Sequence, residues 1–401
     1  MSNVKFIERL LDGAEVEWKQ LGDLADNLDS QRKPITSGLR VPGEVPYYGA
    51  SGVVDYVKDY IFDGDFLLVS EDGANLVARK TPIAFSISGK SWVNNHAHIL
   101  KFNTYTERRY IEIYLNSIDL TPYISGAAQP KLNKKNLNSI DIPIPCPDDP
   151  EKSLAIQAEI VRILDTFTEL TTELTTELNA RKKQYNYYRD QLFSFEEGEV
   201  EWKTLGWVGH VRMCKRIMKN QTSDSGDIPF FKIGTFGKEP NSYISRDIYE
   251  EYRDRYNYPR VGEVLISASG TIGRAVIFDG KDAYFQDSNI VWLENDESKV
   301  LNKYLFYFYQ IANWHVSDGG VIKRLYNDNI KKTPILIPYP DDAEKSLAEQ
   351  ARVVAILDKF DTLANSISKG LPREIELRQK QYEYYRDLLL SFPKPEVTEG
   401  V

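Results

Sequence analysis

The chain has 401 residues, a formal net charge of -9 and 42% hydrophobic residues. That length allows two or three domains with cores of their own, and the acidic balance argues against a protein covered all over with positive charge. Cys146 and Cys214 are the two cysteines, too few for a disulfide framework or a four-cysteine zinc site.

The N-terminus carries four acidic residues where an export signal would need an apolar stretch. No segment has the about 18 apolar residues that a membrane span requires. We therefore expect a cytoplasmic protein with no membrane partner.

The most informative feature of the sequence is an internal duplication. Three blocks recur with most positions identical: EVEWKQLG, IPIPCPDDPEKSLAIQAEIVRILDTFTEL and RKKQYNYYRDQLFSF. They occupy residues 15–22, 142–170 and 181–195, and again residues 199–206, 335–363 and 378–392. The regions between them, 23–141 and 207–334, show no obvious similarity to each other. The period is far too long for a solenoid, so the pattern indicates a two-fold duplication in which constant parts share a task and variable parts discriminate.

In chain order, the first variable region predicts short strands. VPYYGASGVVDYV, DFLLVSEDG, IAFSISG and SWVNNHAHIL combine aromatic and β-branched residues with turn residues, and ERRYIEIYLNSI then predicts a helix. The second variable region repeats this character in IPFFKIG, EVLISASG, AVIFDG and NIVWLEN, followed by the helical stretch NKYLFYFYQIAN. Each region ends on a loop with basic residues. We predict one mixed α+β domain from each.

A long helix is expected after each variable region. Apolar residues recur in the first constant segment every three or four positions, which is typical of a packed or coiled-coil helix. The run PDDPEKS places a proline stop and acidic residues at its start. From Ser153 to about Ser194 this helix would be roughly 60 Å long. The second copy, from about Ser346 to Ser391, provides an antiparallel partner, and Gly370 and Pro372 should kink or interrupt it.

The first helix contains a smaller repeat, TELT TELT TELN, from Thr168 to Asn179. One interpretation is simply an amphipathic helix with a leucine every four residues. The other is a spacer of defined length, because one tetrad more or less changes a helix by roughly 6 Å, close to two base-pair steps.

Features that could suggest chemistry are incomplete in the sequence. His96 and His98 lie on the same side of a predicted strand, as two metal ligands can, but no neighbouring Cys, His, Asp or Glu completes a site. Residues 89–91, Gly-Lys-Ser, resemble the end of a phosphate-binding loop, yet Ala84 stands where the required glycine would be. The chain has no G-x-S-x-G, H-E-x-x-H or G-x-G-x-x-G motif. We expect no catalytic residue, no metal and no cofactor bound by this chain.

The alternation of variable and constant segments resembles the specificity subunits of type I restriction-modification enzymes over essentially the whole chain. The constant blocks and the TELT tetrads are similar to the subgroup usually called type IC. The resemblance implies two target-recognition domains, each for one half of a bipartite site on double-stranded DNA. It also implies that the constant helices bind two methyltransferase subunits and that restriction/translocase subunits complete the complex. S-adenosylmethionine and ATP/Mg would be used by those partners, with adenine N6 as the methylated atom.

This predicts an α+β fold with two mixed α/β recognition domains, separated by two long antiparallel helices and related by a pseudo-two-fold internal repeat. The expected parts are the first recognition domain 1–152, the central helix 153–195, the second recognition domain 196–345, the C-terminal helix 346–392 and a tail 393–401.

Stretches such as YYGASGVVDYV, WVNNHAHIL, SASGTIGRA and the closing loops AAQPKLNKKNL and GGVIKRLYNDNI look like segments that recur among such domains. The residues expected to contact DNA are Asn94, Asn95, His96, Gln129 and Lys131 in the first domain, and Ser269, Thr271, Arg274, Lys323 and Arg324 in the second. Asn and Gln can pair with adenine, and Arg and Lys with guanine or phosphate. The residues expected on the spacer and partner-binding helices are Leu170, Leu174, Leu178, Tyr185, Tyr188, Tyr382 and Tyr385.

Two other classes remain open on the sequence alone. A coiled-coil assembly protein without a DNA role would show the same duplication. A self-contained DNA methyltransferase is disfavoured because no cofactor motif appears. Salt-dependent DNA affinity would argue against the first. Binding of S-adenosylmethionine by the isolated chain would favour the second.

Overall fold

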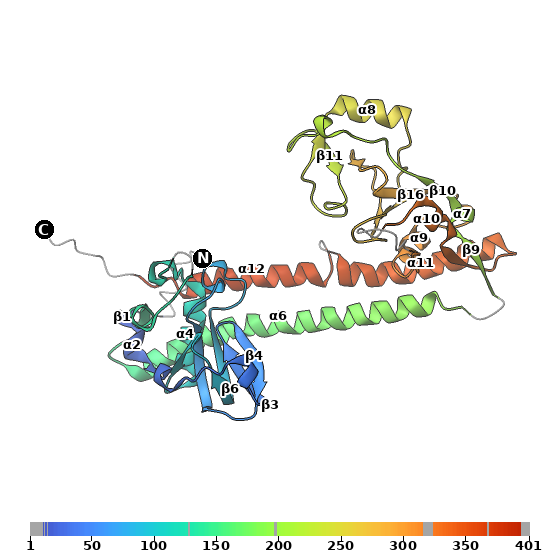
Figure 1. Ribbon diagram of the computed structural model, residues 1–401. Helices are drawn as coiled ribbons and strands as arrows, with labels where there is room; N and C mark the ends of the chain where they lie inside the picture. Colours follow the sequence, from blue (N-terminus) through green and yellow to red (C-terminus); the bar gives the residue numbers. More distant parts are fainter. Residues whose placement is uncertain are drawn as a thin grey trace. The chain divides into compact units, whose positions relative to one another are not determined.

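The computed structural model describes residues 11, 13, 15–126, 129–195, 199–315, 324–366 and 369–393, and the chain divides into two compact units (Figure 1). Unit 1 is Met1–Leu174 with Ile375–Val401, and unit 2 is Thr175–Glu374. Each unit therefore combines one variable region with parts of both constant segments. The expected domains follow the sequence blocks, whereas the compact units divide the central helix itself.

Unit 1 is built on a six-stranded sheet of order β2-β7-β5-β6-β3-β4 and a two-stranded sheet β1-β8. Its strands are β1 (Val16–Gln20), β2 (Asp26–Asn27), β3 (Pro42–Gly49), β4 (Gly52–Val57), β5 (Phe62–Ser70), β6 (Ala84–Val93), β7 (Ala97–Lys101) and β8 (Asp141–Pro145). Its helices are α2 (Leu21–Leu24), α3 (Asn75–Ala78), α4 (Tyr105–Ser117), α5 (Lys134–Asn138) and the first part of α6 (Pro150–Leu192), with short 3-10 turns η1 (Asp29–Gln31), η2 (Ser37–Leu39) and η3 (Thr121–Tyr123). Helix α4 starts at a capping box of Thr104 and Glu107 and packs on β5 and β6.

Unit 2 has a four-stranded sheet β10-β16-β13-β14, a three-stranded sheet β12-β11-β15 and a two-stranded sheet β17-β9. Its strands are β9 (Val200–Thr204), β10 (Gly209–Arg212), β11 (Ile228–Phe231), β12 (Tyr243–Ile244), β13 (Val264–Ser267), β14 (Ala275–Ile277), β15 (Tyr284–Phe285), β16 (Ile290–Asn295) and β17 (Pro334–Pro338). Its helices are α7 (Leu205–Val208), α8 (Arg246–Arg255), α9 (Asn302–Tyr309), α10 (Asn327–Lys332), α11 (Ala343–Asn365) and the start of α12 (Leu371–Leu389), with a 3-10 turn η4 (Lys219–Gln221).

The two variable regions share one topology although their sequences do not align by eye. The order β2-β7-β5-β6 of unit 1 corresponds to β10-β16-β13-β14 of unit 2, and the parallel pairing of β3 with β6 corresponds to that of β11 with β15. The constant sheets share their register as well: Val16 lies opposite Pro145 and Val200 opposite Pro338. The α+β class and the internal repeat predicted from the sequence are confirmed.

The same contacts attach each variable domain to its constant segment. The buried Tyr110 hydroxyl donates to the Pro143 carbonyl over 2.8 Å, and the buried Tyr304 hydroxyl donates to the Leu336 carbonyl over 3.0 Å. The recognition-domain helix is thereby fixed to the constant strand in both units, because a buried hydroxyl must find a partner.

The first constant helix, α6, spans 43 residues and is therefore roughly 65 Å long. It begins at Pro150 and ends at Leu192, a few residues earlier at each end than expected. The Asp149 carboxylate accepts the Lys152 N–H at 3.0 Å, so the acidic run caps the helix as its position suggested.

The second constant segment forms two helices rather than one. α11 ends at Asn365 and α12 begins at Leu371, so the predicted interruption near Gly370 is confirmed and the continuous helix 346–392 is not formed. A Cβ on Gly370 would lie 2.4 Å from the Thr362 carbonyl oxygen, which explains why only glycine fits the break.

Two equivalent aromatic stacks join the constant helices. Within unit 1 the rings of Phe167 and Tyr385 are 5.2 Å apart with an interplanar angle of 16°, and within unit 2 those of Phe360 and Tyr188 are 5.4 Å apart at 22°. Each stack pairs the same two positions of the repeated blocks. In unit 1 the first part of α6 and the last part of α12 run antiparallel (Figure 1).

The other residues expected on these helices differ in burial. Tyr185 is buried and its hydroxyl donates to Gln310 over 2.7 Å, while Tyr382 packs against the core of unit 1. Leu170, Leu174 and Leu178 are partly exposed. Their contribution to partner binding stays a prediction.

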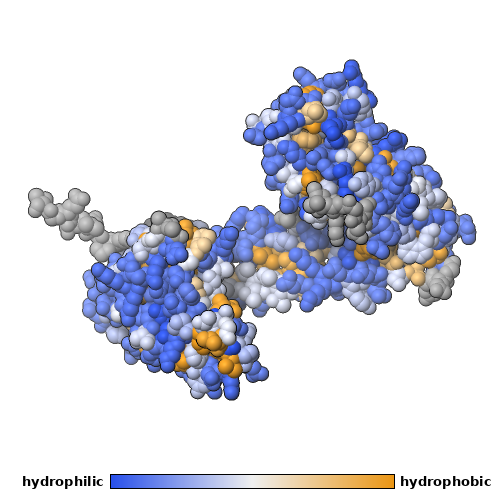
Figure 2. All heavy atoms as spheres, in the orientation of Figure 1, coloured by the Kyte–Doolittle hydropathy of each residue, from blue (hydrophilic) through white to orange (hydrophobic). Residues whose placement is uncertain are grey.

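The visible surface is largely hydrophilic and carries several apolar areas, one of them on unit 1 where β3 and β4 lie (Figure 2). In β4, Val53 and Val54 are exposed. Among the described residues, no helix is both long and apolar enough to cross a membrane.

Candidate nucleic-acid interface

Three of the five residues expected to contact DNA in the first domain line one hollow of unit 1. The hollow has a volume of about 790 Å³ and is lined by Asp72, Gly73, Ala74, Val77, Ala78, His96, Gln129, Pro130 and Lys131. The turn between β6 and β7 brings His96 to it, and the closing loop before α5 brings Gln129 and Lys131. Segments more than 30 residues apart in sequence therefore meet at one face.

The turn between β6 and β7 assigns different roles to its residues. Asn94 is 6% exposed, and its side-chain oxygen accepts the His96 N–H at 2.8 Å. Asn94 therefore shapes the turn, while Asn95 and His96 are exposed. His96 Nδ1 lies 2.9 Å and 3.0 Å from the two carboxylate oxygens of Asp72. His96 faces solvent with a fixed orientation, as a base- or phosphate-contacting side chain requires.

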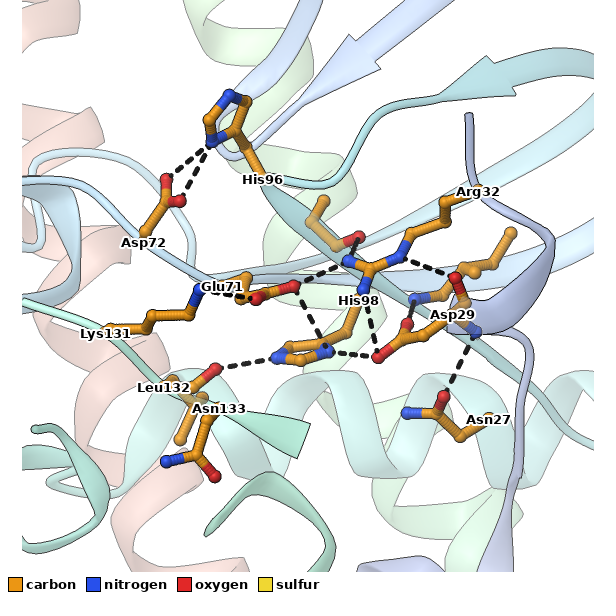
Figure 3. A network of polar contacts seen from close by, with 12 residues as sticks. Asn27, Asp29, Arg32, Glu71, Asp72, His96, His98, Lys131, Leu132 and Asn133 are labelled. Atoms are coloured by element: carbon orange, nitrogen blue, oxygen red, sulfur yellow. Dashed lines mark hydrogen bonds and ion pairs between the residues drawn. The ribbon is translucent and has the colours of Figure 1, made fainter. Parts of the chain in front are cut away.

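Lys131 belongs to a network of charged side chains beneath this face (Figure 3). Its Nζ lies 3.0 Å from Glu71 Oε1, and the other Glu71 oxygen accepts from Arg32 Nη1 at 2.7 Å. The Leu132 N–H donates to the Glu71 carbonyl over 2.8 Å, and the Leu132 carbonyl accepts from His98 Nε2 at 2.7 Å. The closing loop is thus fixed by both main-chain and side-chain bonds.

The carboxylates of the network are held ionised. Burial alone would raise the pKa of Asp29, but the hydrogen bond and charge of His98, with help from the Ile99 N–H and Arg32, leave it below its usual value. Burial likewise acts to raise the pKa of Glu71, and the hydrogen bonds from Arg32 and Lys131 outweigh it. Both groups therefore remain acceptors for the surrounding cations.

The sequence showed no acidic cluster that could complete a site with His98, because the acidic residues come from distant segments. Tertiary structure places ligand atoms of Asp29, Glu71 and His98 within 4.8 Å of one another, a grouping that could in principle hold a metal ion. Arg32 and Lys131 already bind the same carboxylates. The cluster is therefore an ion-pair network, and a divalent cation would have to displace both side chains.

In the second domain, Ser269 and Arg324 meet in the same way. They form an isolated β-bridge, the Leu325 N–H donates to the Ala268 carbonyl over 2.8 Å, and Arg324 Nη2 donates to the Ser288 carbonyl over 2.6 Å. The Ser269 hydroxyl donates to Asn289 Oδ1 over 2.9 Å.

The remaining residues expected in the second domain are less closely grouped. Thr271 is exposed in the turn between β13 and β14. Arg274 Nη1 donates to the Phe236 carbonyl over 2.9 Å, so this side chain supports the turn. Lys323 lies outside the described residues.

A hollow of about 280 Å³ lies at this face of unit 2. It is lined by Arg216, Ile217, Lys219, Thr222, Phe230, Lys232, Gln286, Asp287, Ser288 and Asn289. The DNA contacts expected from the sequence included none of Arg216, Lys219, Lys232 and Asn289. These residues come together only through the pairing of the strands, and the sequence does not show that pairing.

That register makes the two faces comparable position by position. Ser70 lies opposite Ala97 and Ser267 opposite Ile290, so Asp72 corresponds to Ser269 and His96 to Asn289. The Glu71 N–H donates to the His96 carbonyl over 2.9 Å, and the Ala268 N–H donates to the Asn289 carbonyl over 2.7 Å. Lys131 is bridged to Asp72 and Arg324 to Ser269, so Lys131 corresponds to Arg324. The two domains therefore share the same main-chain hydrogen bonding at this face but carry different polar side chains.

Comparisons with known proteins agree with this duplicated architecture. Residues 14–183 and 197–377 each match the model of the type I restriction modification DNA specificity domain. The chain therefore belongs to the type I restriction-modification DNA specificity family.

Relatives cover its whole length. The chain is 51% identical over 399 residues to a Haemophilus influenzae protein named as a type I restriction enzyme specificity subunit, covering 98% of this chain and 99% of that protein. It is 38% identical over 424 residues to a type I restriction enzyme specificity subunit of Escherichia coli, covering 100% of both.

Solved structures share the fold. The crystal structure of the type I restriction-modification S subunit from M. genitalium superposes with a TM-score of 0.58 at 12% identity, over 96% of this chain and 98% of that one. A chain from a structure of the type I R-M system gives a TM-score of 0.57 at 14% identity, over 94% and 97%.

Proposed function

We propose that this chain is the DNA-recognition subunit of a type I restriction-modification complex and that each variable domain recognises one half of a bipartite site on double-stranded DNA. The observation that carries the proposal is that each variable domain has an equivalent polar face. The same strands and closing loop present Asp72, His96 and Lys131 in one domain, and the second presents Ser269 and Arg324. A shared frame with different hydrogen-bonding groups is what two different half-sequences require.

The residue types fit a division of labour between positioning and recognition. Lys131 and Arg324 offer charges to phosphates or guanine, and Gln129 and Thr271 offer groups that can contact base edges. The chain is acidic overall, with a net charge of -9, so these local cations need the support of partner subunits for tight binding.

The proposal assigns chemistry to partners. The constant helices would bind two methyltransferase subunits, and restriction/translocase subunits would complete the complex. S-adenosylmethionine and ATP/Mg would be used by those subunits, while this chain acts without catalysis of its own. An adenine to be methylated lies inside the duplex and must be flipped into a partner pocket.

The decisive experiment is methylome mapping. The chain is co-expressed with its methyltransferase subunit in a methylation-free host, and methylated adenines are mapped across the genome. A single bipartite motif with a fixed gap is the expected result. An assembled complex that methylates nothing would instead favour an assembly protein without a DNA role.

Variants assign the half-sites. Gln129→Ala should relax only one half of the motif and Thr271→Ala only the other, because the two residues lie in different domains. Arg162→Ala, an exposed change on α6, should leave the motif unchanged. If Gln129→Ala and Thr271→Ala altered the same half, the assignment of one half-site to each domain would fail.

The methyltransferase alternative has its own test. Equilibrium dialysis of the isolated chain with S-adenosylmethionine should detect no binding, and saturable binding would revive a self-contained enzyme.

A further inference from the structure

We propose that His98 and Glu71 are positioning residues that fix the closing loop of the first domain, and that recognition of the first half-site depends on a proton held by His98 whereas recognition of the second does not. This inference rests on the proposed function. It concerns the network of Figure 3, which the sequence did not reveal.

The geometry favours a doubly protonated His98 ring. His98 is 1% exposed, its Nδ1 lies 2.6 Å from Asp29 Oδ2, and its Nε2 lies 2.7 Å from the Leu132 carbonyl oxygen. Both partners are acceptors, and a neutral imidazole carries a single N–H. Either neutral tautomer would therefore direct a lone pair at an oxygen inside the domain.

The charges around the ring favour the same state. Asp29 accepts the Ile99 N–H at 3.0 Å and lies 3.4 Å from Arg32 Nη2, so it stays ionised and available to His98. Glu71 Oε2 lies 3.9 Å from His98 Nδ1. Arg32, Lys131 and the protonated His98 face the carboxylates of Asp29 and Glu71. At the same face the Asp72 carboxylate pairs with His96.

The same bonds control the closing loop. Leu132 is attached through its N–H to the Glu71 carbonyl and through its own carbonyl to His98, while Lys131 exchanges two main-chain bonds of 2.8 Å and 2.9 Å with Ser125. Gln129 lies inside the loop that this bridge closes. The ionised Asp29 favours keeping the proton on Nδ1, so a neutral His98 would lose the Nε2 proton. That loss would remove the bond to the Leu132 carbonyl and one positive charge from the network.

The second domain shows that the fold does not need these charges. Strand register places Ala268 at the position of Glu71 and Val291 at that of His98. Continuing the pairing of β10 with β16 one residue past Arg212, and that of β2 with β7 two residues past Asn27, brings Met213 to the position of Asp29. Its Leu325 N–H still donates to the Ala268 carbonyl over 2.8 Å. Apolar side chains therefore support the loop there, as expected when a buried ionic group can be replaced by packing.

The test compares pH profiles of DNA affinity. The full chain, assembled with its methyltransferase subunits, is titrated with duplexes that carry the mapped motif between about pH 6 and pH 9. Wild type should lose about tenfold more affinity across this range than the variant Asp29→Met/Glu71→Ala/His98→Val, which copies the second domain, because one charge-assisted hydrogen bond is worth about that factor. This additional loss of affinity in wild type should vanish for duplexes altered only in the first half-site. It should persist for duplexes altered only in the second half-site.

A second measurement keeps the inference testable if the triple variant does not fold. The chain has four histidines, and in the ¹⁵N-histidine spectrum of the full chain His98, assigned with a His98→Gln variant, should show both ring nitrogens protonated at neutral pH. A neutral His98 ring under conditions of full DNA binding would overturn the inference, as would equal pH profiles for wild type and triple variant. Failure of wild type to bind the mapped duplex at any pH would instead overturn the proposed function.

Discussion

Replacing Asp165 with asparagine is expected to lower the free energy of unfolding of unit 1 by about 2 kcal/mol. Asp165 lies on α6 and binds α4 of the first recognition domain. Arg109 Nε and Nη2 lie 2.9 Å and 2.7 Å from Asp165 Oδ1, and the Tyr105 hydroxyl donates to Oδ2 over 3.3 Å. Burial acts to lower the pKa of Arg109, but its hydrogen bond with Asp165 and the charges of Glu112 and Asp165 raise it.

The magnitude follows from exposure. The two side chains are 20% and 21% exposed, between a surface pair and a buried one. Surface pairs contribute about 0.2–1 kcal/mol, whereas breaking a buried pair costs about 3–5 kcal/mol. Asparagine keeps the shape of aspartate but loses its charge, and Arg109 keeps its 2.5 Å contact with Glu112. The expected loss of stability therefore lies between the values for a surface pair and for a buried pair.

Urea unfolding followed by tryptophan fluorescence measures the effect, and a double-mutant cycle with Arg109→Met isolates the pairwise part. Glu159→Gln is the matched control, because its 2.7 Å pair with Arg162 lies on the same helix with side chains 41% and 66% exposed. The control should be indistinguishable from wild type. Equal losses for Asp165→Asn and Glu159→Gln would refute the argument that burial decides the strength of the attachment.

Further outcomes are expected from the same structure. Tyr304→Phe should destabilise unit 2 by about 1–2 kcal/mol in thermal unfolding, since the change leaves a buried carbonyl without its donor. Gly273→Ala should cost more than about 2 kcal/mol, because φ is +79° and the new Cβ would lie 2.3 Å from Trp314 Nε1, whereas Gly234→Ala meets nothing within 4 Å and should be tolerated. The pKa values of Asp29 and Glu71 lie below their ordinary 3.8 and 4.5. The stability that these carboxylates contribute is therefore complete above about pH 4.5 and is lost as the pH falls through the lowered values. Acid titration followed by circular dichroism should show this loss in wild type and not in the variant Asp29→Met/Glu71→Ala/His98→Val. Insertion of one TELT tetrad should lengthen the gap of the methylated motif and leave both half-sequences unchanged; altered half-sequences would argue against the spacer interpretation.

The sequence by itself determined the organisation of this protein. Duplication is visible wherever side chains are repeated, so the constant blocks, their long helices and the break at Gly370 could all be predicted. The grouping of His96 and Lys131 followed from a resemblance, because nothing in their spacing indicates that the turn after β6 and the closing loop meet.

Tertiary structure alone decided what the variable domains have in common. Main-chain hydrogen bonds fix strand order and register without regard to side-chain identity. β5 and β13 can therefore pair with equivalent strands, β7 and β16, although their sequences diverge. The surroundings of His98 were hidden for a related reason: Asp29 is 69 residues away in sequence and reaches it only through the pairing of β2 with β7. Sequence patterns record periodicity along one element, whereas a buried charge finds its partners across elements, and that pairing exists only once the sheet has formed.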